Sequence, residues 1–437
     1  MALGTSYRKL FGATTISNLG DGVSIIAYPW LASAITRNPL LIALVAVVQR
    51  LPWLLFTLPA GVITDRGDRR RLMVGANTLR AILTAVVAVA VFARRDVLPS
   101  PDEVDQVVST EWLLYIILII ATLLLGVGEV LYDNSAQTFL PAIVETDDLE
   151  KANGRLYSAE LVANQFAGPP LAGLLLAIGF ALPFVVDAGS FAVSAALVFS
   201  IAATPRTPAD PGDRRPWRTE AAEGFRWLWH HDLLRTLAIT LGLLNMLGNV
   251  GGALMVLWGQ EVLGTSTTEF ALLSTAGAFG GVLGGWVAST VSRRIGSGPS
   301  LGLTLWGGAL CSVALGLVST WPLAWLLIFV LMFTGVLWNV ITVSLRQTII
   351  PDRLLGRVNS VYRFFGWGAI PIGGLIGGVL VAVLEGPLSR DSALRATWIV
   401  SGIAQVGVAV FAMPRLTTAK MDAARAAAEP APTAPAG

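Results

Sequence analysis

The sequence predicts an all-α integral membrane protein with twelve transmembrane helices in two six-helix bundles. Hydrophobic residues make up 54% of the 437 positions, charged residues only 13%, and the mean hydropathy is +0.68. Soluble domains carry charge on about a quarter of their residues. Apolar windows of about 20 residues, the length that crosses hydrocarbon, follow one another along the chain. They lie at 10–34, 40–62, 72–93, 112–135, 156–179, 181–202, 234–258, 269–291, 299–319, 322–345, 360–384 and 395–413.

Arginine and lysine are concentrated in one set of loops between these windows. The opposite set holds only Arg37, Arg94, Arg95, Arg390 and Arg395. Because cytoplasmic loops carry the excess of basic residues in membrane proteins, we expect both termini to lie in the cytoplasm. Lysine is rare among the basic residues and alanine is abundant, which indicates a GC-rich bacterial genome. The predicted location is therefore a bacterial cytoplasmic membrane.

The expected organisation is a bundle at 1–202, a cytoplasmic linker at 203–232, a second bundle at 233–414 and a disordered tail at 415–437. The linker contains a candidate amphipathic helix at 217–229, which would lie in the membrane interface. A flexible connection between the halves is the alternative. Alanine and proline dominate the tail, and this composition predicts disorder.

A dense polar segment separates the second and third windows. Its glycine, its acidic residue and its basic residues are Gly61, Asp65, Arg66, Arg69 and Arg70. Because both flanking windows are long enough to cross the bilayer, the segment is predicted to be a tight loop on the cytoplasmic face.

The two halves of the chain resemble each other. The fourth window ends in Gln-Thr-Phe-Leu-Pro at 137–141, and the tenth ends in Gln-Thr-Ile-Ile-Pro at 347–351. The polar segment has a copy after the eighth window in which serine replaces the aspartate, formed by Gly285, Ser289, Arg293 and Arg294. Repeated units with a binding site between them are typical of secondary transporters.

These residues resemble the major facilitator superfamily, whose loop motif is glycine, three residues, Asp-Arg, two residues and a basic pair. Asp68 departs from the glycine that many members carry at that position. The resemblance covers about residues 8–414 and implies the major facilitator fold with transport by alternating access. A narrower similarity, to the branch of enterobactin exporters and macrolide-efflux proteins, rests on the segments 18–22, 50–53, 137–141 and 351–358.

Gly168 and Pro169 begin a Gly-Pro-Pro-Leu-Ala-Gly segment in the fifth window, similar to the motif that marks antiporters within the superfamily. Proline removes a backbone donor and small neighbours allow close packing, so we expect a bend against another helix. We predict a role in gating, and a purely structural kink is the alternative.

Several ionisable residues lie inside the predicted spans, where each costs at least about 2.5 kcal/mol. Asp21 and Arg50 fall at matching depth in adjacent windows, which predicts a salt bridge between them. The bridge either separates during transport or pins the two helices permanently. Glu160 has no permanent cation beside it in sequence and is the candidate for proton coupling, whereas Asp187 is expected to reach outer water.

A second group of charges lies toward the cytoplasmic ends of the third and fourth windows. Arg80 belongs to the third window, and Glu129 and Asp133 are four residues apart in the fourth. We expect these three residues to form a network with the polar loop. Such a network favours a gate over a cargo site.

The resemblance also implies that the first, fourth, seventh and tenth spans line a central cavity. The resemblance implies that five polar residues lie in the wall of this cavity, namely Asn18, Asp21, Asn245, Asn249 and Asn339. Amides that join helices by hydrogen bonds are the alternative. The remaining side chains of these spans are mostly apolar and aromatic, which suits a bulky amphipathic cargo better than a sugar.

The predicted function is secondary active transport, specifically proton-coupled export of a hydrophobic or amphipathic small molecule such as a drug, siderophore or secondary metabolite. A metabolite importer or facilitator is the alternative among transporters, and a non-transporting membrane sensor is the alternative outside them. The sequence contains no hydrolase, metalloprotease or nucleotide-binding motif, so we expect neither an enzyme nor a cofactor. The energy source should be an ion gradient, with the choice between proton and sodium left open.

The expected partners are the lipid bilayer and a small-molecule cargo, bound by a monomer. A net charge of +2 is too small to predict nucleic-acid binding. His230 and His231 are the only histidines, and they predict no metal site. Cys311 is the single cysteine, which excludes a disulfide within one chain.

Overall fold

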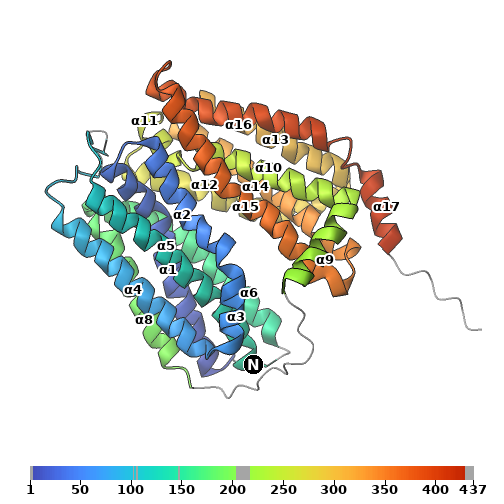
Figure 1. Ribbon diagram of the computed structural model, residues 1–437, viewed down its shortest axis with the longest axis horizontal. Coiled ribbons are helices and arrows are strands. Elements are labelled where there is room, and N and C mark those ends of the chain that lie inside the picture. The colour runs from blue at the N-terminus through green and yellow to red at the C-terminus, as the bar shows by residue number, and fades with distance from the viewer. Residues whose placement is uncertain (1–2, 102, 105–106, 146–147, 203–216, 429–437) are drawn as a thin grey trace, which may run out of the picture.

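A computed structural model of the chain describes residues 3–101, 103–104, 107–145, 148–202 and 217–428. Every regular element in these ranges is a helix (Figure 1). The first half contains α1 (Gly4–Ile35), α2 (Pro39–Leu55), α3 (Thr57–Arg66), α4 (Arg69–Ala93), α5 (Trp112–Phe139), α6 (Leu149–Leu161), the π-helix η4 (Val162–Ala167), α7 (Gly168–Ile178) and α8 (Ala181–Phe199). The second half contains α9 (Trp217–His230), α10 (Asp232–Gly252), α11 (Met255–Glu261), α12 (Thr267–Ile295), α13 (Ser297–Leu317), α14 (Trp321–Ile349), α15 (Asp352–Leu384), α16 (Arg390–Ala412) and α17 (Thr418–Ala428).

The twelve predicted windows all coincide with helical segments. In the described part of the chain, ten segments are long and apolar enough to cross a membrane. The first window corresponds to α1, a helix of 32 residues that carries Asp21 and two basic residues. The second window is divided at Phe56 into α2 and α3. The predicted all-α membrane fold is confirmed.

Polar caps determine where several helices begin. Asn38 accepts hydrogen bonds from two backbone N–H groups of α2, at 2.9 and 3.4 Å. Asp68 accepts one from the N–H of Arg71 at 3.1 Å, at the start of α4. Such side chains satisfy donors that have no partner inside the helix. Asp68, the departure from the usual loop motif, is therefore the N-cap of α4.

The helices form two bundles, α1–α8 and α10–α16 (Figure 1). In the first bundle α4 packs against α5 and α8, and α1 packs against α8. In the second, the pairs are α12 with α14, α13 with α16, and α10 with α15. The bundles meet where α2 packs against α15 and α7 against α12, with a smaller contact between α1 and α11.

Buried apolar side chains form three clusters, and only one of them includes both bundles. This shared core contains Trp30 and Tyr115 of the first bundle and Trp258 and Phe270 of the second. It lies where α1 ends and α2, α12 and α16 begin, which we call the joined end. At the opposite end, the separated end, each bundle has a core of its own.

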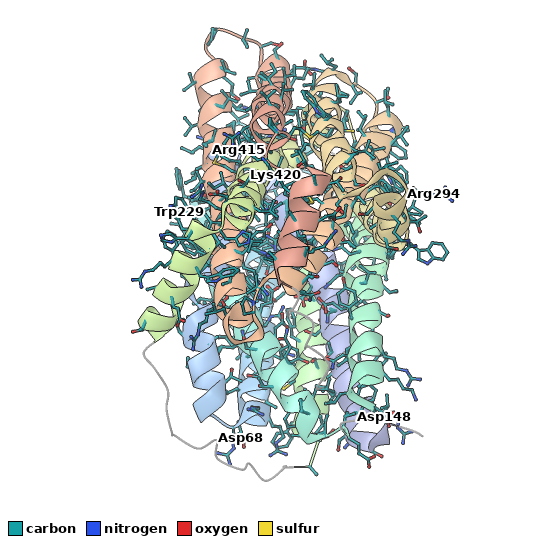
Figure 2. All side chains as sticks on the ribbon, turned by 90° about the vertical axis from the view of Figure 1, so that its right-hand side faces the viewer. Asp68, Asp148, Trp229, Arg294, Arg415 and Lys420 are labelled. Carbon is teal, nitrogen blue, oxygen red and sulfur yellow. The ribbon has the colours of Figure 1, made fainter. Side chains whose placement is uncertain are left out.

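The two bundles diverge from the joined end toward the separated end (Figure 1). In Figure 2, Asp68 and Asp148 mark the separated end of the first bundle, and Arg294 and Lys420 lie on the second bundle higher in the view. The structure is therefore closed between the bundles at one end only.

The structure differs from the sequence prediction in the tail. Residues 418–428 form α17 instead of a disordered segment, while 429–437 lie outside the described residues. Met421 is fully buried in the core of the second bundle, and the backbone N–H of Gly298 donates to Thr418 Oγ1 at 2.9 Å. This packing stabilises the helix.

The linker is described only from residue 217 onward, and its segment 203–216 lies outside the described residues. The predicted helix at 217–229 is present as α9 and packs against α15. Leu228 is fully buried, and Arg357 of α15 pairs with Glu223 at 2.6 Å. A location in the membrane interface stays a prediction.

The fifth window bends where α6, η4 and α7 follow one another. Pro169 and Pro170 have no N–H for the helical ladder, and the backbone passes through a π turn just before them. A Cβ atom on Gly168 would lie 2.4 Å from Gly22 Cα, so α7 and α1 touch backbone to backbone. Farther along α7, a Cβ atom on Gly173 would lie 2.7 Å from Ala271 Cβ in the other bundle.

Replacing Gly168 by alanine should destabilise the protein by about 1–3 kcal/mol, because overpacking forces the α1 and α7 backbones apart. The matched control is Gly189→Ala in α8, where a Cβ atom would meet nothing within 4 Å. That variant should be neutral or more stable by up to about 1 kcal/mol, owing to helix propensity. Thermal unfolding of both purified variants measures the difference, and equal unfolding temperatures would contradict the close contact.

Candidate functional site

A buried ion pair joins α1 to α4 inside the first bundle. Arg80 Nη2 donates to Asp21 Oδ1, with the arginine side chain 3% exposed and the aspartate 25%. The second guanidinium nitrogen, Nη1, lies 3.4 Å from both Ser17 Oγ and Asn77 Oδ1. Asn77 in turn donates to Ser194 Oγ at 2.8 Å, which extends the polar contacts to α8.

The predicted salt bridge between Asp21 and Arg50 is wrong. Arg50 is exposed on α2, and in the described part of the chain no carboxylate pairs with it. The two residues do share a depth, but α2 packs mainly against α15 and α5 rather than against α1. Depth along a helix follows from the sequence, whereas the direction that a side chain faces depends on how the helices pack.

Aromatic and acidic groups complete the surroundings of Arg80. Its guanidinium carbon lies 3.9 Å from the centre of the Phe191 ring, within the range of a cation–π contact. A Cβ atom on Gly128 would lie 2.8 Å from Arg80 Cγ, so this glycine makes room for the side chain. Glu129 and Asp133 act on Arg80 electrostatically, but within the described residues neither forms an ion pair with it. Among the described residues, the predicted network of Arg80, Glu129, Asp133 and the polar loop is not formed by direct contacts, and Arg80 pairs with Asp21 instead.

A second carboxyl group lies in the same bundle. Asp187 of α8 is 1% exposed, so the expectation that it reaches outer water is wrong. Ser24 Oγ of α1 donates to Asp187 Oδ2 at 2.6 Å, and Ser190 Oγ lies 3.5 Å from Oδ1. Gly20 provides the space, because a Cβ atom there would lie 2.3 Å from Asp187 Oδ1. Asp187 therefore belongs to the polar interior together with Asp21 and Arg80.

An ion cluster ties the two bundles together at the joined end. Arg37, in the loop between α1 and α2, pairs with Glu261 and donates to Gln260 Oε1 at 2.6 Å. Gln260 Nε2 donates to Ser33 Oγ at 2.8 Å. Arg390 binds the other oxygen of Glu261 at 2.5 Å and donates to the backbone oxygen of Arg37, also at 2.5 Å. We call these five residues the joined-end cluster.

A buried acid–base pair in a helical membrane bundle, with an ion cluster closing one end between two bundles, is an arrangement suited to alternating access. The family model described as Major Facilitator Superfamily matches residues 10–374. The chain belongs to the Major Facilitator Superfamily. It is a secondary transporter and not an enzyme.

Relatives within the superfamily include efflux proteins. The chain is 27% identical to the multidrug efflux pump Tap of Mycolicibacterium fortuitum, covering 93% of this chain and 95% of that protein. It is 23% identical to the enterobactin exporter EntS of Shigella boydii, covering 89% and 88%. The predicted resemblance to the superfamily and to its enterobactin-exporter branch is confirmed.

Two solved structures share the fold. A bacterial homologue of the iron transporter ferroportin in the inward-facing state has a TM-score of 0.69 at 19% identity, covering 94% of this chain and all of that one. A bacterial homologue of the human lysosomal transporter Spinster, inward-facing and unoccupied, has a TM-score of 0.69 at 15% identity, covering 98% of each chain.

The superfamily loop motif lies at the turn from α3 to α4. Arg69 Nη1 donates to the backbone oxygen of Thr138 at 2.6 Å, and Arg70 Nη1 donates to that of Ile201 at 2.6 Å. These two arginines bind carbonyl groups at the ends of α5 and just beyond α8, where cations are favourable. Gly61 has open space beside it. The backbones of Asp65 and Arg66 complete α3, and their side chains lie outside the described set.

Two of the four predicted cavity asparagines, Asn18 and Asn245, join helices. Asn18 Oδ1 accepts from Asn164 Nδ2 of η4 at 2.8 Å, and Asn245 Nδ2 donates to the backbone oxygen of Gly366 on α15 at 2.9 Å. Asn249 donates within α10, to the backbone oxygen of Asn245 at 2.9 Å. These contacts match the alternative in which amides connect helices.

Two further candidates are exposed. Asn339 lies on the surface of α14, and Glu160 lies on that of α6, where it interacts electrostatically with Glu129. The carboxyl group of Glu160 is therefore not surrounded by the protein interior. Asp187, which is buried, and Asp21, which is half-buried against Arg80, are therefore stronger candidates for proton coupling.

Proposed function

We propose that this transporter is a proton-coupled exporter of a hydrophobic or amphipathic small molecule, such as a drug, siderophore or secondary metabolite. The observation that carries the proposal is the buried pair of Asp21 and Arg80, which places a titratable group in the interior of the first bundle. The relatives named as a multidrug efflux pump and an enterobactin exporter support the cargo class.

Proton coupling would depend on the several carboxyl groups that surround a single cation, Arg80. Arg80 interacts electrostatically with four carboxyl groups, those of Asp21, Glu129, Asp133 and Asp187. Buried charges are stable only when they are compensated, so one guanidinium favours one ionised carboxylate beside it. Proton uptake by Asp21 would release Arg80 toward another acid and break the ion pair that links α1 to α4. Transport results when protonation and cargo binding favour opposite conformations.

The proposed orientation places both termini in the cytoplasm of a bacterial cell. The separated end carries most of the basic loop residues, so it would face inward. The joined end would then face outward, and the joined-end cluster would be the outer gate in its closed form. In this reading the structure represents the inward-facing state.

A transport assay tests the proposal. Purified protein in liposomes should accumulate at least one labelled hydrophobic antibiotic or siderophore against its gradient when a pH gradient is imposed, and a protonophore should abolish that accumulation. Expression in intact cells should lower the accumulation of the same compound. If the compound only equilibrates across the membrane without a pH gradient, the protein is a facilitator. If accumulation requires a sodium gradient, sodium and not the proton is the coupling ion. Higher accumulation in cells that express the protein would indicate import.

A further inference from the structure

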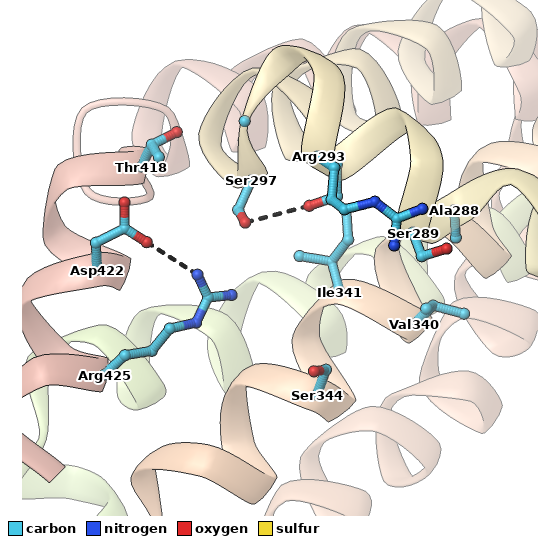
Figure 3. Close-up of a pocket in the computed structure, with 12 residues that line it drawn as sticks. Ala288, Ser289, Arg293, Ser297, Val340, Ile341, Ser344, Thr418, Asp422 and Arg425 are labelled. Carbon is cyan, nitrogen blue, oxygen red and sulfur yellow. Dashed lines mark hydrogen bonds and ion pairs between the residues drawn. The ribbon is translucent and has the colours of Figure 1, made fainter. Parts of the chain in front are cut away.

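A cavity of about 420 Å³ lies within the second bundle, between α12, the start of α13, α14 and α17 (Figure 3). Its lining residues all belong to the second bundle and to α17, outside the contacts between the bundles. Its polar lining includes Ser289, Ser292, Ser297, Thr418, Arg293 and Arg425. The cavity is therefore distinct from a cargo path that alternates between the two halves.

The lining carries a net positive charge and several hydroxyl groups. Arg425 pairs with Asp422 at 2.9 Å on α17, facing Ser297 across the cavity (Figure 3). Arg293 has no carboxylate partner among the described residues, and its Nη2 donates to Thr290 Oγ1 at 3.4 Å. Two guanidinium groups and one carboxylate leave one positive charge, which matches a phosphodiester. Arginine and hydroxyl donors are the groups that bind phosphate oxygens.

The basic charge of this site follows from the internal repeat. The copy of the loop motif on α12 keeps Arg293 and Arg294 but has Ser289 where the first half has Asp65. The acid that could neutralise Arg293 within its own loop is thus missing. The N-terminus of α13 also lies at the cavity, where the Gly298 N–H already donates to Thr418 Oγ1 at 2.9 Å.

The residues beside the cavity have the pattern expected near a lipid headgroup region. Phe279, Val282 and Trp286 are exposed on α12, with Trp286 83% exposed. Arg293 follows Trp286 by seven residues, about two helical turns, and so projects from the same face. Exposed tryptophan followed by arginine near the end of a spanning helix marks the border between hydrocarbon and headgroups.

Helix α17 closes the remaining side of the cavity. Its first residue, Thr418, accepts a hydrogen bond from the Gly298 backbone, and Met421 is fully buried. A Cβ atom on Gly298 would lie 2.6 Å from the Thr418 backbone nitrogen, so the helix lies directly on the start of α13. This fixed position holds Asp422 and Arg425 at the cavity.

We propose that this cavity binds the phosphodiester of a membrane glycerophospholipid headgroup, with Arg293 as the main anion contact and Arg425 as the second. Basic pockets between transmembrane helices are suited to anionic headgroups. The acyl chains would lie along the exposed apolar face of α12. The site belongs to the second bundle and is independent of proton coupling.

Binding of short-chain phosphatidylglycerol to the full chain in non-ionic detergent tests the site, with native mass spectrometry and thermal shift as readouts. The tightest binding step should weaken about tenfold or more in the double variant Arg293→Gln with Arg425→Gln, because charged hydrogen bonds are lost. Arg293→Lys should retain part of the affinity. The matched control is Arg294→Gln, an adjacent arginine outside the cavity lining, which should bind as the unmodified chain does.

Two comparison ligands identify the chemistry. Phosphatidylethanolamine, which has the same phosphodiester, should also bind, whereas diacylglycerol with the same chains should bind at least about tenfold more weakly. Equal binding of diacylglycerol would overturn the headgroup assignment. Inorganic phosphate that binds as tightly and displaces the lipid would indicate a site for free anions instead. Unchanged lipid binding by the double variant would place the lipid elsewhere.

Discussion

Replacing Arg80 by glutamine is expected to abolish proton-driven transport and to lower the free energy of unfolding by about 3–5 kcal/mol. The side chain is 3% exposed and is the cation nearest to Asp21. Without it, the carboxyl groups of the first bundle lose their buried counter-charge. Thermal unfolding and proteoliposome transport of the purified variant measure the two effects separately.

The double variant Asp21→Asn with Arg80→Gln should be more stable than Arg80→Gln alone, because it leaves no uncompensated charge from the pair. It should still fail to couple transport to the pH gradient. Arg50→Gln is the matched control, since Arg50 is exposed and should be nearly neutral for stability. If the single and double variants are equally unstable, the pair does not stabilise the bundle as the geometry indicates.

Replacing Glu261 by glutamine is expected to open the joined end. Glu261 binds Arg37 of the first bundle and Arg390 of the second, so its charge holds two guanidinium groups across the contact. Losing hydrogen bonds to charged groups should shift the conformational equilibrium by about tenfold or more. The lone cysteine, Cys311, can be replaced by alanine, and Ser33→Cys then reports opening because Ser33 is fully buried there. Thiol labelling at this position should become correspondingly faster.

The matched control for this experiment is Glu385→Gln. Glu385 pairs with Arg390 at 2.6 Å but belongs to the same bundle, so its loss removes no contact between the bundles. Labelling at position 33 should change little in this variant. Equal acceleration by both substitutions would mean that Arg390, and not the bridge through Glu261, controls the joined end.

The spans and their order could be predicted because hydrocarbon imposes a length and a composition on each helix. Which side chains face each other could not. Asp21 is at matching depth with Arg50, yet it pairs with Arg80, because α1 and α4 both pack against α8 whereas α1 contacts α2 only slightly. The depth of a residue along its helix does not show in which direction its side chain points around the helix axis.

The joined-end cluster left no sequence signal of its own. Arg37 and Arg390 are 353 residues apart, and Glu261 is the last residue of the short helix α11 between them. Only the packing of two bundles brings them together. By contrast, α17 could have been predicted, because residues 418–428 are rich in alanine, the best helix former, and contain no proline.

The core shared at the joined end gives the transport cycle a dependence on temperature. It buries aromatic rings of both bundles, including Trp30 and Phe270 with centroids 5.2 Å apart. Opening that end to water would expose these rings and give the step a positive heat-capacity change. Hydrophobic contacts weaken on cooling, so cold would shift the population away from the state in which the joined end is closed. The same aromatic packing that stabilises the closed joined end therefore makes the population of that state depend on temperature.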